Sequence, residues 1–156
     1  MSEPVVYDCM IFLQAALRPE RVHSTFKAVR AGAAKLFVSL EVLAEIRDVL
    51  SRPQLRANAP GLTSQSIDAF LADVLKHATL IRDVPDLYVL ERDPKDSKYI
   101  NLALAAKATH LVTWDNDLLG LMDYSRSDAR LFRATFPDLK FVDPPAFLQR
   151  LADLRK

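Results

Sequence analysis

Cysteine, glycine and long apolar stretches are all scarce in this chain of 156 residues. The single cysteine, Cys9, excludes an internal disulfide and any cysteine-rich metal site, and it suits a reducing compartment. Three glycines leave no Gly-rich phosphate-binding loop. No apolar run approaches the roughly 18 residues of a membrane span, and the first residues lack the basic start and apolar run of a signal peptide. We therefore expect a cytoplasmic protein without a membrane span.

A strong excess of positive charge is also missing. The formal net charge is +1, which is not the charge of a protein that coats itself with nucleic acid. However, four carboxylates bound to divalent cations would leave the remaining surface at roughly +5. Net charge is therefore a mild argument against nucleic-acid binding and does not exclude it.

Half of the residues are hydrophobic, enough for one globular core, and no repeat or low-complexity linker divides the chain. We expect a single domain over residues 1–156. Short apolar runs alternate with amphipathic segments, which predicts an α/β fold with a mainly parallel central sheet and helices on both faces. The predicted strands cover residues 4–7, 35–38, 79–81, 110–113 and 139–142.

Helices are predicted over residues 40–50, 66–78, 94–108 and from Pro144 onwards. The segment 66–78 has apolar residues on one stripe with a period of 3.6, and Thr63 or Ser64 can cap it. Two prolines and a glycine predict a loop over residues 52–62. The polar and basic segment 123–137 receives no assignment.

Two predicted strands end at aspartates. Asp8 follows the first strand, and Asp115 and Asp117 follow the fourth. Ligand sites in open parallel sheets form at the carboxyl ends of strands, so neighbouring strands would bring Asp8 and Asp115 together. Each residue alone is also explained as a turn residue or a helix cap.

Two more acids are predicted on helices. On the helix from Leu40, Glu45 borders the apolar face, whereas Glu41 and Asp48 lie deeper in the polar face. Asp96 lies at the start of the helix that follows Asp93-Pro94. Asp96 could instead favour the helix dipole and form a capping box with Asp93, for which we expect a capping role.

None of these acids indicates a functional site by itself, but the four acids Asp8, Glu45, Asp96 and Asp115 taken together do. Four carboxylates brought together without a basic neighbour would repel one another, and little in the sequence indicates a cation placed to neutralise them. Mg²⁺ or Mn²⁺ resolves the conflict, because both ions take hard oxygen ligands and retain water molecules. Such ions can generate a hydroxide and stabilise a phosphate under attack.

The acids and their surroundings resemble the PIN-domain nucleases, and more narrowly the bacterial VapC-like toxins of toxin–antitoxin systems. The resemblance covers nearly the whole chain. Its two most specific pieces are the Asp-Pro-Lys-Asp segment at 93–96 and the Leu-Val-Thr-Trp-Asp-Asn-Asp-Leu-Leu segment at 111–119.

The resemblance implies a three-layer α/β/α sandwich and Mg²⁺- or Mn²⁺-dependent cleavage of RNA. It assigns catalytic and metal-binding roles to Asp8, Glu45, Asp96 and Asp115, and auxiliary roles to Asp117 and Thr113. It also implies a cognate antitoxin and a homodimer. The chain departs from the common Asp-Thr-Asn pattern at Cys9 and Met10, and it carries a bulky Trp114 that could pack or offer a stacking face for a base. We expect Trp114 to pack.

Other functions find less support. The three histidines, His23, His77 and His110, lack zinc-site spacing. Cys9 beside Asp8 suits a packed residue better than a nucleophile. A phosphatase or receiver-like domain would need a lysine and an aspartyl nucleophile in motifs that the sequence lacks. A weakly active PIN-like module that binds RNA or a partner protein stays open. The following basic residues could hold RNA, although a solvated surface explains most of them: Arg18, Arg52, Arg56, Lys98, Arg126, Arg130 and Arg133.

Overall fold

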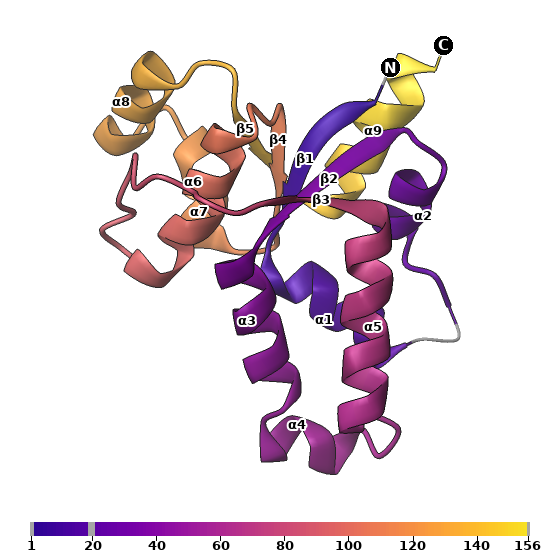
Figure 1. Ribbon diagram of the computed structural model, residues 1–156. Coiled ribbons are helices and arrows are strands. Elements are labelled where there is room, and N and C mark those ends of the chain that lie inside the picture. Colours follow the sequence, from indigo (N-terminus) through magenta and orange to yellow (C-terminus); the bar gives the residue numbers. More distant parts are fainter. Residues whose placement is uncertain (1, 19–20, 156) are drawn as a thin grey trace.

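The computed structural model describes residues 2–18 and 21–155 and contains a five-stranded, wholly parallel sheet (Figure 1). The strands are β1 (Glu3–Tyr7), β2 (Ala34–Ser39), β3 (Ala78–Ile81), β4 (His110–Val112) and β5 (Lys140–Val142). The sheet order is β3-β2-β1-β4-β5. The prediction of a parallel α/β sheet is confirmed, and each predicted strand is present within about a residue of its expected bounds.

Helices follow each strand. The α-helices are α1 (Cys9–Leu17), α2 (Ser24–Arg30), α3 (Leu40–Leu50), α4 (Pro53–Asn58), α5 (Ser64–His77), α6 (Ser97–Ala105), α7 (Asn116–Leu119), α8 (Ser127–Thr135) and α9 (Pro144–Leu154). Two 3₁₀ turns, η1 (Pro94–Asp96) and η2 (Gly120–Met122), lie before α6 and after α7. Helices α3 and α5 extend away from the sheet and are joined by α4 (Figure 1).

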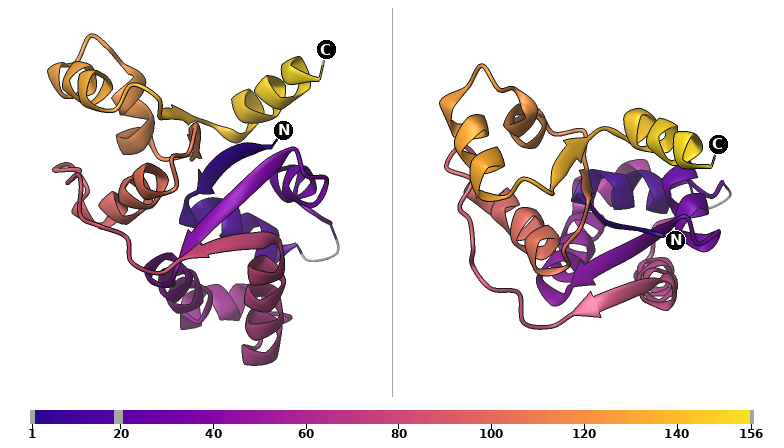
Figure 2. Two further views of the ribbon diagram at one scale, coloured as in Figure 1. Left: turned by 45° about the horizontal axis from the view of Figure 1, so that its top comes forward. Right: turned by 90° about the horizontal axis from the view of Figure 1, so that it is seen from above.

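The helices form layers on both faces of the sheet. On one face, the ring of Tyr7 contacts Phe12 of α1, Phe26 of α2 and Phe147 of α9. On the other face, α6 packs against β1, β2 and β4. Figure 2 shows α9 and α6 on opposite sides of the sheet. The predicted three-layer sandwich is therefore confirmed.

The core explains why the strands stay fixed. Val5, Val6 and Tyr7 are fully buried, and so are Leu111 and Val112 in the neighbouring strand. Each such side chain contributes about 1.5–3 kcal/mol by leaving water. The hydroxyl of Tyr7 is satisfied because it donates to the carbonyl oxygen of Thr25 at 2.8 Å. The aligned, buried strands hold the residues that follow them in fixed positions at the sheet edge.

Local sequence signals account for several helix starts. Thr63 caps α5 through a reciprocal capping box with Ser66. The side chain of Asp143 caps α9, which begins with Pro144 and Pro145. The predicted loop over 52–62 was wrong in part, because Arg52-Pro53 opens the short helix α4, with proline at its first position. The unassigned segment 123–137 contains α8.

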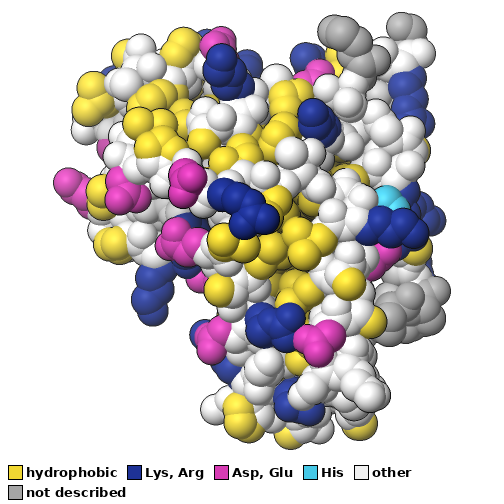
Figure 3. Space-filling view, viewed as in Figure 1, with side chains coloured by type: hydrophobic (Ala, Val, Ile, Leu, Met, Phe, Trp, Pro, Cys, Tyr) yellow, Lys and Arg dark blue, Asp and Glu magenta, His cyan; other side chains and the backbone are white. Residues whose placement is uncertain are grey.

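The surface is mixed in character. Figure 3 shows hydrophobic side chains gathered between α3 and α5, with charged side chains around them. Over residues 2–18 and 21–155, no helix is long and apolar enough to cross a membrane.

Candidate functional site

The candidate site lies at the point where the strand order of the sheet changes direction. From β1 the chain runs through β2 to β3, and then returns to the other side of β1 to form β4 and β5. A crevice forms at the carboxyl ends of strands on either side of such a switch point. Here those strands are β1 and β4, in which Tyr7 pairs with Val112. The residues that follow, Asp8 and Thr113, are therefore neighbours.

A hydrogen-bond network joins the ends of β1 and β4. The buried hydroxyl of Thr113 donates to Oδ2 of Asp8. The same hydroxyl oxygen accepts the backbone N–H of Asp115 at 2.9 Å. Thr113 thereby fixes the positions of both aspartates.

Both aspartates also cap helices. Oδ1 of Asp8 accepts the N–H of Met10 at 3.1 Å at the start of α1, and Oδ1 of Asp115 accepts the N–H of Asp117 at 2.8 Å at the start of α7. The capping explanation therefore holds for both residues, and it is compatible with a site. Each cap uses one carboxylate oxygen and fixes the direction of the other.

Three carboxylates come within metal-binding distance of one another. One oxygen each from Asp93, Asp96 and Asp115 lies within 4.8 Å of the other two. Asp93 and Asp96 flank Pro94 and Lys95 at the turn before α6. Asp93 occupies the predicted N-cap position before Pro94, but its side chain makes no capping hydrogen bond. The capping box between Asp93 and Asp96, the alternative explanation of Asp96, is not formed.

The electrostatics of the group favour a cation. Burial, together with the adjacent Asp115 and Asp93, raises the pKa of Asp96 to about 8. Burial raises the pKa of Asp8 to about 6, although the hydrogen bond from Thr113 acts in the opposite direction. Among the described residues, the buried Oδ2 of Asp96 has no hydrogen-bond partner. An all-oxygen donor set with an unpartnered oxygen suits a hard divalent ion such as Mg²⁺ or Mn²⁺.

A hollow of about 220 Å³ opens at this group. Its lining consists of Asp8, Cys9, Met10, Asp96, Tyr99, Trp114 and Asp115. Burial raises the pKa of the Cys9 thiol to about 12, and the carboxylates of Glu45 and Asp8 add to the shift. The thiol is therefore protonated at neutral pH, which agrees with a packed residue rather than a nucleophile.

Trp114 was expected to pack, but the structure does not place it in the core. The residue is 43% exposed, and its indole N–H donates to Oε1 of Gln14 at 3.2 Å. The preceding residue, Thr113, points inward and is fully buried. Because successive residues of an extended segment face opposite ways, Trp114 lies at the rim of the hollow.

Glu45 lies behind this hollow rather than on its lining. Its carboxylate accepts hydrogen bonds from the phenol of Tyr99 and from the ammonium group of Lys98. Tyr99 lines the hollow and is buried, so it connects Glu45 to the aspartates. No neutralising cation was expected from the sequence, yet Lys98 forms this ion pair with a side chain only 13% exposed.

The remaining acidic candidates are peripheral. Asp117 is outside the group of three carboxylates, and its backbone carbonyl accepts a hydrogen bond from Arg92 at 3.1 Å. On α3, Glu41 and Asp48 are exposed while Glu45 is half-buried. The border position predicted for Glu45 agrees with this burial.

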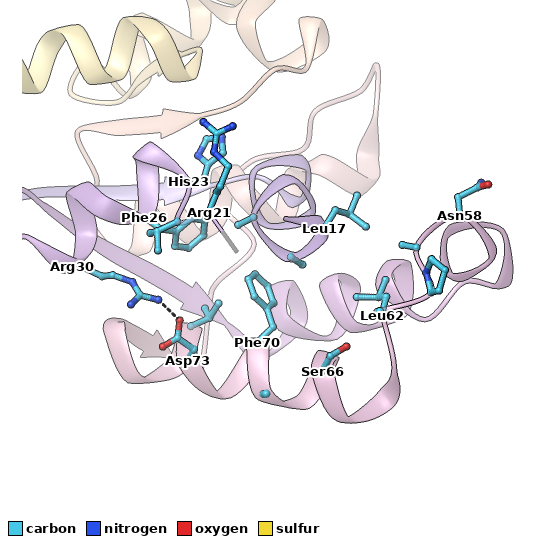
Figure 4. A pocket seen from close by; sticks show the side chains of 18 residues that line it. Leu17, Arg21, His23, Phe26, Arg30, Asn58, Leu62, Ser66, Phe70 and Asp73 are labelled. Carbon is cyan, nitrogen blue, oxygen red and sulfur yellow. Dashed lines mark hydrogen bonds and ion pairs between the residues drawn. The ribbon is translucent and has the colours of Figure 1, made fainter. Parts of the chain in front are cut away.

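A larger hollow than the acidic one lies elsewhere. It measures about 680 Å³ and lies between α1, α2 and α5, with Phe26 and Phe70 in its lining (Figure 4). Among the described residues of its lining, the one carboxylate is that of Asp73, which is paired with Arg30 at 2.7 Å. A paired carboxylate in a mainly apolar lining offers no metal site, so the smaller acidic hollow is the better candidate for chemistry.

Comparison with known proteins agrees with this geometry. The sequence pattern of the PIN domain matches residues 4–117, which include every acid of the candidate site. A search of curated proteins gives no match. PIN domains are generally nucleases that use divalent metal ions. Because the match covers well over half of the chain and the fold agrees, the chain belongs to the PIN-domain family.

Proposed function

We propose that the protein is a Mg²⁺- or Mn²⁺-dependent ribonuclease that hydrolyses phosphodiester bonds at the acidic hollow. The observation that carries the proposal is the convergence of oxygens from Asp93, Asp96 and Asp115 beside the buried, unpartnered Oδ2 of Asp96. Membership of the PIN-domain family supports it independently.

In this proposal, the residues of the site have metal-binding or positioning roles. Asp93, Asp96 and Asp115 hold the cation, and Asp8 completes the acidic lining from the end of β1. When bound, the cation supplies an activated water and stabilises the charge that develops on the phosphate. Thr113 holds Asp8 and Asp115 in place through its hydroxyl group.

Glu45 has an indirect role in the proposal. Its carboxylate is already shared by Lys98 and Tyr99, so it positions Tyr99 against the hollow. It would bind a cation only by releasing Lys98. Asp117 stays an auxiliary acid that the first turn of α7 keeps beside Asp115.

The proposal extends to biological context through the resemblance to VapC-like toxins. We propose a single PIN-like domain over residues 1–156 that acts in the cytoplasm as the toxin of a toxin–antitoxin pair. It would form a homodimer and bind a small antitoxin protein. Co-purification of the product of an adjacent gene with the chain, and loss of growth inhibition when both are expressed, would test this part separately.

The test of the enzymatic part uses end-labelled RNA and single-stranded DNA of the same sequence. We expect cleavage of RNA with Mn²⁺ or Mg²⁺ and none with EDTA. Asp8→Asn and Asp96→Asn should each abolish cleavage, whereas Asp138→Asn, at an exposed acid outside the hollow, should not. Cleavage that survives both site substitutions would show a contaminant or a wrong site. Equal cleavage of DNA would overturn the restriction to RNA.

A second function, binding of RNA without efficient cleavage, is favoured by one observation. Lys98 neutralises Glu45 and leaves one less free carboxylate near the hollow. Tight RNA binding without metal-dependent cleavage, in a preparation whose folding is verified by circular dichroism, would support this alternative over the first.

A further inference from the structure

An apolar rim lies directly beside the acidic hollow. Met10 and Trp114 line the hollow together with Asp8, Asp96 and Asp115. Met10 is 51% exposed and Trp114 is 43% exposed. An indole exposed next to carboxylates gains nothing from core burial at that position. Its flat face is instead available to a flat ligand that enters the hollow.

The indole is also held in a fixed orientation. Its N–H donates to Gln14 of α1, which lies four residues after Met10 and therefore on the same side of the helix. A restrained aromatic ring loses less conformational entropy on binding than a freely rotating one. Trp114, Gln14 and Met10 thus form a preorganised platform.

The platform continues into a positively charged hollow. Gln14 also lines a second hollow of about 430 Å³, whose other lining residues include Arg18, Arg21 and Lys27. Among the described residues that line it there is no carboxylate. From Met10 to Arg18 the chain advances eight residues, or about 12 Å along a helix. A stacked nucleic-acid strand covers that distance in about three to four nucleotides.

The other basic residues considered from the sequence are already engaged. Arg52, Arg56, Lys98, Arg126, Arg130 and Arg133 each donate to a side chain or a carbonyl of this chain. Within residues 2–18 and 21–155, no such partner is found for the side chain of Arg18. Of the basic residues considered from the sequence, Arg18 is thus the one without such a partner among the described residues, and it lies at the end of α1.

We propose that an unpaired nucleobase stacks on Trp114 beside the bond to be cleaved, and that the strand runs from there along α1 to the hollow of Arg18, Arg21 and Lys27. The inference rests on the proposed function and adds two subsites to it: a base platform at Trp114 and a phosphate site in the hollow of Arg18, Arg21 and Lys27. A base inside a duplex is stacked on both faces by its neighbours, so it has no face free for the platform.

The chain offers a direct probe, because Trp114 is its only tryptophan. Single-stranded RNA titrated into the unaltered protein with EDTA should quench the tryptophan emission, while a duplex of the same sequence should not. Trp114→Ala should weaken binding of fluorescently labelled RNA by about 5- to 150-fold, the range that stacking of one base supplies. Trp114→Phe should recover most of the loss. Leu131→Ala, at an apolar residue that is also exposed, is the matched control.

The salt dependence of RNA binding tests the role of the hollow of Arg18, Arg21 and Lys27. Arg21→Gln should weaken RNA binding and lower the slope of log affinity against log salt by about one, because one phosphate contact is lost. Lys140→Gln, at an exposed lysine outside this hollow, should leave the slope unchanged. An unchanged slope in Arg21→Gln would overturn the proposed path of the strand.

These outcomes separate the two proposals. Quenching by RNA without any metal-dependent cleavage would keep the base platform and reject the nuclease. Metal-dependent cleavage with no quenching and an unaffected Trp114→Ala variant would reject the platform and keep the nuclease. An emission that responds to protein concentration and ignores RNA would identify the rim as a contact between two copies of the chain, and would overturn the platform.

Discussion

The hydroxyl group of Thr113 donates to the carboxylate of Asp8 from the neighbouring strand. This bond joins two positions separated by 105 residues in the sequence, and it forms at the point where the sheet order reverses. Since Thr113 also accepts the N–H of Asp115, one buried side chain positions acids from two segments. We therefore expect the site to depend on Thr113 although it is fully buried.

Thr113→Val keeps the shape of the side chain and removes its hydroxyl group. The N–H of Asp115 then loses its acceptor, at a cost of about 1–3 kcal/mol in the free energy of unfolding. The pKa of Asp8 should rise further, because the hydrogen bond from Thr113 holds it down, and Mn²⁺ binding should require a higher pH. Thr113→Ser should retain metal binding. Chemical denaturation and Mn²⁺ titration at several pH values measure both effects, and equal metal affinity in Val and Ser variants would contradict this role.

Asp93→Asn tests an acid for which only a capping role was predicted from the sequence. Because an Asp93 oxygen lies within 4.8 Å of oxygens from Asp96 and Asp115, the substitution should weaken Mn²⁺ binding at least about tenfold, as loss of a charged ligand would. Asp117→Asn should change it much less. Isothermal titration with Mn²⁺ measures the affinities. If Asp117→Asn has the larger effect, the assignment of the three ligands is wrong.

Stability without metal should depend on pH in a defined direction. The folded-state pKa values of Asp8 and Asp96, about 6 and about 8, lie above the unfolded value of about 4. The folded state therefore binds more protons between these values, and the stabilisation due to protonation is lost as pH rises from about 4 through about 8. The melting temperature in EDTA should fall between pH 5.5 and 8.5, and Mn²⁺ should raise it most at pH 8.5.

Asp96→Asn isolates this contribution from the other titrating groups. The variant should lose less stability than the unaltered protein between the same two pH values, and Mn²⁺ should shift its melting temperature less. Asp138→Asn serves as the control at an exposed site. An identical pH dependence in Asp96→Asn and the unaltered protein would show that Asp96 is not titrating in this range.

The ion pair between Lys98 and Glu45 should matter more than the exposed pairs of the surface. Their side chains are 13% and 26% exposed, compared with 52% and 63% for Arg47 and Asp68. Lys98→Met leaves the Glu45 carboxylate with Tyr99 alone and should destabilise the fold by about 1–3 kcal/mol. Arg47→Met should cost under about 1 kcal/mol. Urea denaturation of both variants measures the difference, and equal costs would contradict it.

Much of the fold was predictable because strands and long amphipathic helices carry periodic signals. Helix α1 was not predicted, because its residues Ile11, Phe12, Leu13 and Ala16 are all buried and give no polar stripe. Helix α4 was missed for another reason: Pro53 looks like a breaker but occupies the first helical position, where its missing N–H costs nothing.

The site was predictable only where sequence position implies place in the sheet. Asp8 and Asp115 follow strands, so the parallel topology itself brings them to one edge. Helical spacing predicted the border position of Glu45, but it could not reveal the contacts of Glu45 with Lys98 and Tyr99. The approach of Asp93 to Asp96 and Asp115 likewise depends on side-chain directions. A 3₁₀ turn at Pro94–Asp96 leaves Asp93 without a capping bond, and Lys98 reaches Glu45 from a different helix, 53 residues away in the sequence.

The central claim, that these carboxylates hold the divalent ion for RNA hydrolysis, is tested most directly by one rate. That rate is the initial rate of Mn²⁺-dependent cleavage of single-stranded RNA by Asp96→Asn, measured beside Asp138→Asn and the unaltered protein. We expect a loss of at least about 100-fold in Asp96→Asn, and no change in Asp138→Asn. A rate for Asp96→Asn within about threefold of the unaltered protein would contradict the account.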